Sequence, residues 1–194
     1  FEGTTLHEII AEAGGYTSDA YPYGASLYRK KVAEIQQEAF DKTYISLVNF
    51  LASNGSSGSV GVASTPNLPL ILAELKAAQF KGRLSAEFSQ RKVEKEASLD
   101  TILSDGDEIF VPFFTSDVYV TGDILNPGGR RYSSELKPSD YIEQSGGLGK
   151  FADNSRIVLI KPNGDAEVIK AKQFFSYSGS TIYPGSIIYA PREI

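Results

Sequence analysis

Hydrophobic and polar residues alternate with a period of two in the second half of the chain, a spacing that is typical of β-strands. In the run DVYVTGDILNPGGRRYS (117–133), Val118 and Val120 alternate with polar partners ahead of a stretch of turn-forming residues. That stretch is Asn126, Pro127, Gly128 and Gly129. The run RIVLIKPNGDAEVIKA (156–171) has the same form, because PNGD separates two apolar, β-branched segments. The pattern therefore predicts two β-hairpins.

A short helix is predicted between the two hairpins. The segment SDYIEQSGG (139–147) begins with Ser139, a good N-cap residue that follows Pro138, and it ends with two glycines. After the second hairpin, TIYPGSIIYAP (181–191) combines a Pro-Gly turn with a final apolar strand. The order strand, strand, helix, strand, strand, strand predicts an α+β domain in which one helix covers a mixed sheet. This is the order of a β-grasp (ubiquitin-like) fold.

The first half of the chain repeats parts of the second. LHEIIAEAGGYTSDAYPYGASLYR aligns with PSDYIEQSGGLGKFADNSRIVLI, so that Gly14 and Gly15 fall on Gly146 and Gly147 at a spacing of 132 residues. A helix that ends in a left-handed backbone conformation requires glycine there, and both glycine pairs directly follow a predicted helix. We interpret both pairs as a signature of the fold and not as a ligand-binding loop.

A second alignment places LSDGDEIFVP on IYPGSIIYAP, with Gly106 on Gly185 and a spacing of only 79 residues. Because the spacing falls from 132 to 79, the first copy carries about 53 residues that the second copy lacks. We predict two tandem β-grasp domains, 1–115 and 116–194, with a helical-hairpin insert at about 29–80 in the first.

The first copy contains most of the predicted β-grasp elements. A helix is expected at 5–13, with strands at 25–28, 82–88 and 108–113. No residues before Phe1 supply its opening hairpin. The first domain is therefore predicted to be incomplete at its N-terminus, unless a neighbouring segment completes its sheet.

The insert has the pattern of two helices. Hydrophobic residues recur at i, i+4, i+7 and i+11 on one helix face: Phe40, Tyr44, Leu47 and Leu51. They predict a helix over 28–52, about 35 to 40 Å long. A Ser/Gly-rich loop at 53–65 precedes a second predicted helix at 68–80. Such a helical hairpin is expected to pack on a neighbour or on the sheet of its own domain.

Composition narrows the possible functions. The net charge of −5 and pI near 5.0 argue against the basic surface that nucleic-acid binding needs. The chain has no Cys and one His, which excludes disulfides and thiolate metal sites and leaves no histidine cluster for a metal. No run of eighteen apolar residues predicts a transmembrane segment. No catalytic constellation is visible, so we expect neither an enzyme nor a cofactor. Because the chain begins with Phe-Glu-Gly, we expect it to be an excised domain or a processed product.

Several motifs carry a family resemblance. The run VYVTGDILNPGGRRYSSELKPSDYIEQSGGLGKFADNSRIVLIKPNGDAEVI and the closing PGSIIYAP resemble the soluble ligand-binding β-grasp (SLBB) domain. They look most like the copies in outer-membrane polysaccharide export proteins of the Wza type. TLHEIIAEAGG, GRLSAEF and LSDGDEIFVP are similar in the first copy, which departs from the pattern by its insert.

The resemblance implies a function in the cell envelope of a Gram-negative bacterium. It implies a periplasmic protein associated with the outer membrane through parts not in this chain, and a ring-forming homo-oligomer that moves capsular or other exopolysaccharide. An inner-membrane polysaccharide co-polymerase is an implied partner. The alternative that we keep open is a monomeric carbohydrate-binding module.

Candidate ligand-binding residues come from two segments. Tyr16, Tyr21 and Tyr23 crowd one stretch, and tyrosine rings pack against sugars while their hydroxyls form hydrogen bonds. Arg130 and Arg131, beside Tyr132, could hold an acidic polysaccharide. The alternatives are that these tyrosines are strand and interface residues, and that the arginines lie in a solvated turn.

Other polar motifs have simpler interpretations. GGLGKF (146–151) departs from the phosphate-binding loop pattern in its spacing. His7, at a helix start, is expected to be a surface histidine. The acidic residues Asp105, Asp107 and Glu108 lack the spacing of a calcium-binding loop and are expected to form a solvated turn, so no metal site is predicted.

Overall fold

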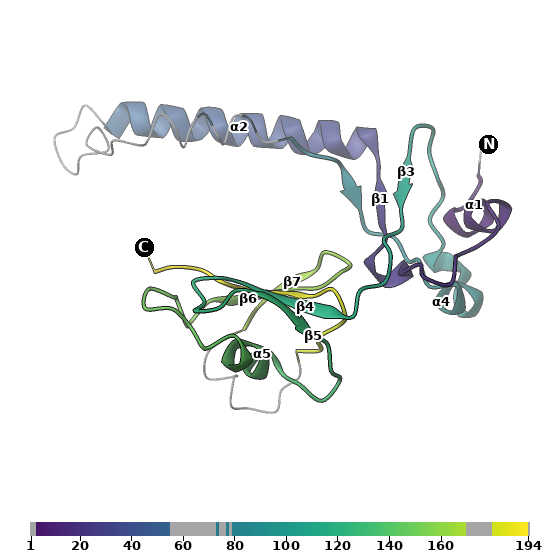
Figure 1. The fold of residues 1–194 in the computed structure, drawn as a ribbon. Helices are drawn as coiled ribbons and strands as arrows, with labels where there is room; N and C mark the ends of the chain where they lie inside the picture. The colour runs from purple at the N-terminus through teal and green to yellow at the C-terminus, as the bar shows by residue number, and fades with distance from the viewer. Residues whose placement is uncertain (1–2, 55–72, 74–76, 78, 170–179, 194) are drawn as a thin grey trace. The chain divides into compact units, whose positions relative to one another are not determined.

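The computed structural model describes residues 3–54, 73, 77, 79–169 and 180–193 (Figure 1). The chain divides into two compact units. The first unit comprises residues 1–4, 26–86 and 102–109, and the second comprises 5–25, 87–101 and 110–194. The domain boundary near residue 115 stays a prediction.

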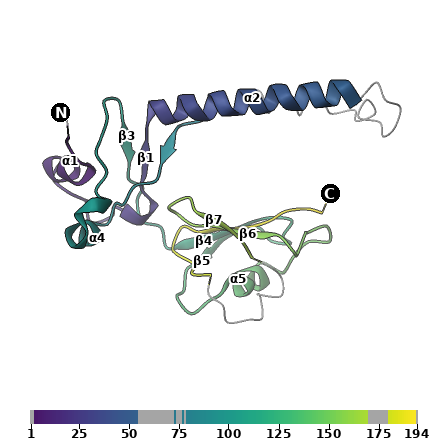
Figure 2. The same ribbon diagram turned by 180° about the vertical axis from the view of Figure 1, so that it is seen from behind.

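The second unit contains a five-stranded mixed sheet in the order β5-β4-β8-β6-β7. Its strands are β4 (Asp117–Gly122), β5 (Gly128–Arg131), β6 (Ile157–Ile160), β7 (Ala166–Ile169) and β8 (Ile187–Ala190). β4 and β8 are parallel, and the other neighbouring strands are antiparallel. The helix α5 (Pro138–Gln144) lies on one side of the sheet in both views (Figures 1 and 2). This confirms the predicted α+β class and the β-grasp order of elements in the second half of the chain.

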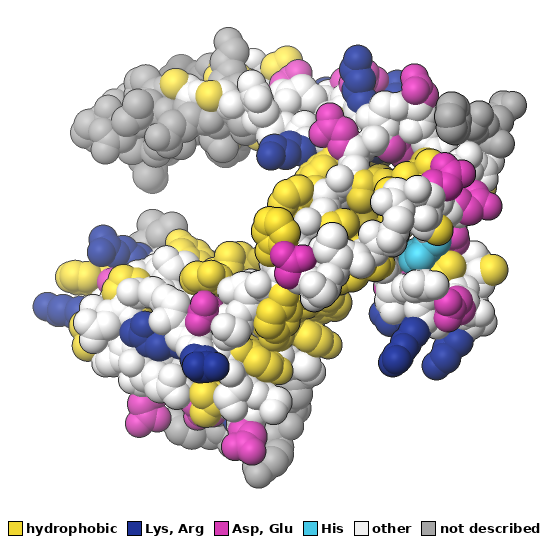
Figure 3. Space-filling view, turned by 45° about the vertical axis from the view of Figure 1, so that its right-hand side comes forward, with side chains coloured by type: hydrophobic (Ala, Val, Ile, Leu, Met, Phe, Trp, Pro, Cys, Tyr) yellow, Lys and Arg dark blue, Asp and Glu magenta, His cyan; other side chains and the backbone are white. Residues whose placement is uncertain are grey.

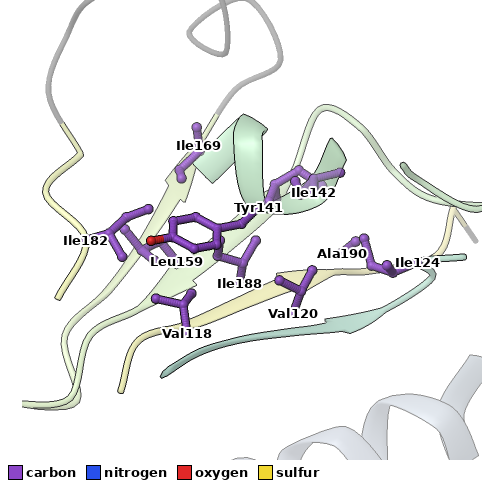
Figure 4. Packing of buried hydrophobic residues seen from close by; sticks show 11 residues of the cluster. Val118, Val120, Ile124, Tyr141, Ile142, Leu159, Ile169, Ile182, Ile188 and Ala190 are labelled. Atoms are coloured by element: carbon purple, nitrogen blue, oxygen red, sulfur yellow. The ribbon is translucent and has the colours of Figure 1, made fainter. Parts of the chain in front are cut away.

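The core of this unit lies between α5 and the sheet (Figure 4). From the sheet, Val118, Leu159 and Ile188 are fully buried because they alternate with residues on the other face. From the helix, Tyr141 is also fully buried, and its polar end is satisfied: the Tyr141 hydroxyl accepts a hydrogen bond from the Ser133 N–H (2.8 Å) and donates to the Ser133 carbonyl oxygen (3.2 Å). A buried hydroxyl without such partners would be costly.

The predicted start of α5 was wrong by two residues. Pro138 is the first helical residue and Lys137 is the N-cap, whereas Ser139 lies inside the helix. A proline suits the first turn because its fixed φ is already helical and it has no N–H to satisfy. The Lys137 N–H donates instead to Oδ2 of Asp140 (2.7 Å), a side chain in the first turn.

The first unit contains a three-stranded sheet in the order β2-β1-β3. Its strands are β1 (Ser26–Tyr28), β2 (Arg83–Leu84) and β3 (Glu108–Phe110), so the strands predicted at 82–88 and 108–113 are shorter than expected. The order β2-β1-β3 matches β7-β6-β8 of the other sheet, as a second copy without its opening hairpin would give. This match supports the predicted tandem arrangement, which remains a prediction.

The long helix of the insert is present as α2 (Lys30–Asn54). Phe40 of the predicted stripe contacts Phe80, with ring centroids 5.3 Å apart, and Tyr44 (6.5 Å), whereas Leu47 is exposed. The second predicted helix (68–80) and the preceding loop fall largely outside the described residues.

Short helices in residues 5–25 and 87–101 complete the second unit. They are α1 (Leu6–Glu12), the 3-10 turn η1 (Pro22–Gly24), α4 (Gln90–Lys95) and the 3-10 turn η3 (Ala97–Leu99). Thr5 caps α1 with a capping box, its hydroxyl accepting from the Glu8 N–H while the Glu8 carboxylate accepts from the Thr5 N–H. The sequence analysis predicted α1 but neither α4 nor η3.

The two glycine pairs end α1 and α5 in the same way. Gly15 N–H donates to the Ile10 carbonyl and Gly14 N–H to that of Ala11, and the residues 132 positions later form the same two bonds. All four glycines have φ between 81° and 98°. This is the Schellman geometry, in which a left-handed backbone satisfies the last carbonyl groups of a helix.

Candidate functional site

An aromatic cluster lies within the second unit and is formed by Tyr21, Tyr23, Phe114 and Tyr183. The Tyr21 ring meets Phe114 edge to face, with centroids 5.3 Å apart, and lies 6.1 Å from Tyr23. Tyr23 in turn packs on Tyr183 at 4.4 Å. Ring pairs of this kind stabilise a contact beyond the area that they bury. The cluster joins the loop after α1 to the ends of the five-stranded sheet.

Backbone hydrogen bonds hold the aromatic cluster in place. Tyr21 N–H donates to the Pro112 carbonyl (2.8 Å), and Phe114 N–H donates to the Asp19 carbonyl (2.8 Å). The loop also packs tightly at Gly24, where a side-chain Cβ would lie 3.0 Å from Cγ of Pro112. The loop is therefore paired with residues 112–114 like a short length of sheet.

Two of the tyrosines in the aromatic cluster stay protonated across the physiological pH range. Burial raises the pKa of Tyr21 to about 12, with Tyr132 and Tyr183 adding to the effect. Burial, together with the charge and hydrogen bond of Tyr183, raises the pKa of Tyr23 further above its usual value. Both hydroxyls therefore remain neutral hydrogen-bonding groups.

The structure brings together three of the predicted ligand-binding tyrosines. Tyr21 and Tyr23 belong to the aromatic cluster, and Tyr132 is near enough to influence Tyr21. Tyr16 has a separate role: its hydroxyl donates to the Phe88 carbonyl oxygen (2.8 Å), and burial raises its pKa to about 12. These contacts favour the structural alternative, and sugar binding by these tyrosines stays a prediction.

The two arginines do not form one cationic site. Successive residues of a strand point to opposite faces, and Arg130 is paired with Val118 on the core side while Arg131 is paired with Asp117. The Arg130 guanidinium donates to the carbonyl oxygens of Gly129 (2.9 Å) and Asn126 (2.8 Å), so it closes the hairpin turn. Arg131 is exposed on the other face.

The acidic turn in the first unit is not fully solvated, contrary to the prediction. The Asp107 side chain is only 3% exposed and forms a two-pronged ion pair with Arg29, with Nε–Oδ1 at 2.9 Å and Nη2–Oδ2 at 2.7 Å. It also accepts from Ser104 N–H (2.9 Å). The Arg29 hydrogen bonds, aided by the Ser104 N–H, hold the pKa of Asp107 below its usual value. The ion pair was missed because its partners are 78 residues apart.

We expect Asp107→Asn to lower the free energy of unfolding of the first unit by about 1 to 2 kcal/mol at neutral pH. Because the folded pKa is lowered, the stabilisation from the charged form is complete above the unfolded value near 3.9 and is lost as pH falls through the folded pKa. The difference between native and variant proteins should therefore shrink below about pH 4. Urea denaturation at several pH values measures it.

Asp105→Asn is the matched control, since Asp105 is an exposed carboxylate in the same turn. This variant should change stability little at any pH. A pH-independent loss in Asp107→Asn, or an equal loss in both variants, would contradict a charge-dependent role for the ion pair.

His7 is not a freely exposed surface residue, so that prediction was wrong. Its side chain is 13% exposed, and Nδ1 lies 3.0 Å from Oδ1 of Asp100. Although burial acts to raise it, hydrogen bonds from His7 and Thr5 hold the pKa of Asp100 below its usual value. The contact exists because Leu6 N–H donates to the Thr101 carbonyl (2.8 Å), which brings the start of α1 beside the end of η3.

Within the described ranges, no three His, Asp or Glu side chains are grouped so that they could hold a metal ion. Among the helices that the structure describes, none has the length and apolar character to cross a bilayer.

The aromatic cluster was only partly visible in the sequence. Crowding of tyrosines at 16–23 indicated one side of it, whereas nothing in the local pattern marked Phe114 or Tyr183. Both residues become recognisable only once the strands are paired, because they lie far along the chain from Tyr21 and Tyr23.

Comparison with known proteins places these elements in a class. The model of the SLBB domain family matches residues 2–38 and 118–170. The matched ranges include α1 and β1 from one half of the chain and the segment from β4 to β7 from the other. The chain is thus an SLBB domain protein, as its motifs indicated.

More particularly, the chain is related to polysaccharide transport proteins. It is 30% identical over 169 residues to a polysialic acid transport protein, KpsD, of Escherichia coli, covering 84% of this chain and 29% of that protein. A second KpsD of Escherichia coli is 30% identical over 167 residues, covering 84% and 28%. The chain therefore spans less than a third of the length of these relatives, and the resemblance to the polysaccharide export family is confirmed.

Proposed function

We propose that this chain is a non-enzymatic, periplasmic portion of a capsular or exopolysaccharide export protein associated with the outer membrane of a Gram-negative bacterium. The observation that carries the proposal is the similarity to the polysialic acid transport proteins, which extends over 84% of the chain. Its β-grasp domains would pack subunit against subunit in a ring around a conduit. An inner-membrane polysaccharide co-polymerase is the further partner that we expect.

Exposed hydrophobic side chains support a role in subunit packing. Figure 3 shows hydrophobic side chains, coloured yellow, at the surface. Phe113, which lies next to the aromatic cluster, is 75% exposed, and Phe114, which belongs to the cluster, is 54% exposed. Large apolar side chains grouped at the surface are typical of sites that another molecule covers. The segment 113–114 is therefore our candidate for a contact between subunits.

The helix α2 offers a second contact surface. Over residues 30–49, where its side chains are described, none is buried, and Ile35 and Ile45 are 55% and 57% exposed. A helix of this length gains most of its stability in proteins from packing against other elements. Contact with a neighbouring subunit would provide that packing.

Light scattering on the full-length protein in detergent tests the proposal. We expect a single oligomeric species, and we expect Phe113→Glu to shift it toward smaller species because a charge would have to be buried at the contact. The matched control is Leu125→Glu, which places the same charge at another exposed apolar position (64% exposed). A strict monomer at all concentrations would count against an export ring, and a monomer that binds oligosaccharide would favour a carbohydrate-binding module.

A further inference from the structure

The face of the five-stranded sheet opposite α5 carries large side chains. We call it the outer sheet face and define it by Tyr119, Arg131, Val158, Val168 and Tyr189. Their placement follows from the register, because Tyr189 is paired with Val158 and Val158 is paired with Val168. The residues that precede and follow them along each strand face the core. Tyr119 precedes the buried Val120 and so also points to the outer sheet face.

The outer sheet face exposes an unusual amount of apolar surface. Val168 is 55% exposed, Tyr119 is 43% exposed and Tyr189 is 41% exposed. These residues lie on three strands of one sheet, β7, β4 and β8. In sheets with one solvated face, that face is normally polar. A continuous apolar area on it indicates a surface that binds something.

Tyr119 and Tyr189 lie on neighbouring strands, and their side chains are exposed to solvent. β4 and β8 are parallel with Tyr119 opposite Ile187 and Thr121 opposite Tyr189, so the tyrosines are diagonal neighbours on one face. The Tyr119 ring leans over Gly129 of β5, with Cε1 and Cδ1 3.7 and 3.8 Å from where a Cβ would stand. Unlike Tyr21 and Tyr23, neither ring has an aromatic partner among the described residues.

Polar side chains lie beside Tyr119 and Tyr189 on the outer sheet face. Arg131 of β5 and Asp117 of β4 are paired across the strands on the outer sheet face. Arg131 is exposed, and in the described part of the chain its guanidinium takes part in no ion pair. A guanidinium donates up to five hydrogen bonds and a carboxylate accepts several, so the pair suits a ligand rich in hydroxyl groups.

We propose that the outer sheet face binds a carbohydrate chain. Sugar rings stack their C–H surfaces on Tyr119 and Tyr189, while Arg131 donates to hydroxyl or carboxylate oxygens and Asp117 accepts from hydroxyls. In a dry contact with a second copy, these polar groups would each need a fixed protein partner. A hydrated glycan supplies such partners itself. The choice of carbohydrate rests on the proposed function, whereas the position of the site rests on the sheet.

Nuclear magnetic resonance titration of the 194-residue chain tests this site. The probes are oligomers of sialic acid, which carry carboxylates, and maltohexaose, which is neutral. We expect shifts concentrated at Tyr119, Tyr189 and their neighbours, and roughly three- to tenfold weaker binding in Tyr119→Val and in Tyr189→Val from the lost stacking. Valine keeps the strand preference, so signals away from the face should be unchanged.

Phe151→Val is the matched control, because Phe151 is an exposed aromatic residue (58%) of the same unit outside the sheet. Its affinity should equal that of the native chain. Arg131→Gln separates the two ligand classes: it should weaken binding of the sialic acid oligomers more than that of maltohexaose if the carboxylates are recognised. Binding of either probe at this face supports the proposal.

Three outcomes would overturn it. They are no shifts with either probe at millimolar concentration, shifts centred elsewhere, and self-association through this face that Tyr119→Val abolishes. The export proposal can fail separately: a monomeric full-length protein that binds sugar on this face contradicts the ring, whereas an oligomer that binds no sugar contradicts only the present inference.

Discussion

Replacing Gly122 by alanine is expected to lower the free energy of unfolding of the second unit by roughly 2 to 5 kcal/mol. Gly122 ends β4 with φ at 95°, a left-handed conformation that disfavours any side chain. A Cβ added there would overlap the backbone carbonyl of Ala190. That carbonyl is fixed because it accepts a hydrogen bond from Asp123 N–H (2.8 Å) in the parallel β4–β8 pair. Strain and steric overlap therefore act together at the end of the β4–β8 pair.

Gly147→Ala provides the control for Gly122→Ala. Gly147 has nearly the same φ, 94°, but nothing lies within 4 Å of its added Cβ. The control should therefore lose only the conformational part, about 1 to 2 kcal/mol. Urea denaturation followed through the amide signals of Val118 and Ile188 measures both variants. Equal losses in the two would show that the Ala190 backbone moves aside.

Leu159→Ala is expected to lower the free energy of unfolding of the second unit by about 2 to 5 kcal/mol. Leu159 lies on β6 and is fully buried, and Figure 4 shows it among the side chains of the core cluster. Removing one methine and two methyl carbons loses their transfer free energy and leaves a cavity that a rigid sheet cannot close.

The same substitution at an exposed position shows whether the loss of stability comes from the burial of the leucine or from the change of leucine to alanine itself. Leu125 is 64% exposed, so Leu125→Ala should change the stability by less than about 0.5 kcal/mol. Both variants are compared by their urea midpoints, with amide signals of the second unit as the probe. A loss in Leu159→Ala no larger than that in Leu125→Ala would mean that the core between α5 and the sheet is not closely packed.

Local patterns in the sequence predicted most of the second unit. The alternation around Val118 and Val120 placed a strand, and the PNGD turn placed the β6–β7 hairpin, because both signals act over a few residues. The helix start at Ser139 was wrong for an equally local reason. The prediction gave more weight to Ser139 as a good N-cap residue than to the preference of proline for the first helical position, which Pro138 occupies.

The candidate site was less predictable, although one part could have been worked out. Arg130 and Arg131 are adjacent in a predicted strand, so their alternation already places them on opposite faces. The partners of Tyr16, His7 and Asp107 could not be read in this way. Their contacts join residues 72 to 93 positions apart, and the periodicity of hydrophobic and polar residues does not predict pairs so distant in the chain.

By itself, the sequence determined the order of strands and helix, the glycine pairs that end two helices, and the family to which the chain is related. These features depend on backbone preferences and hydrophobic spacing within short segments. Only the tertiary structure decided how the tyrosines are used. Pairing of β4 with β8 places Tyr119 and Tyr189 on one open face, while folding of the 16–25 loop occupies Tyr21 and Tyr23 in contacts with Phe114 and Tyr183. The physical reason is that exposure depends on which distant strands become neighbours, and this is settled by packing across the whole sheet.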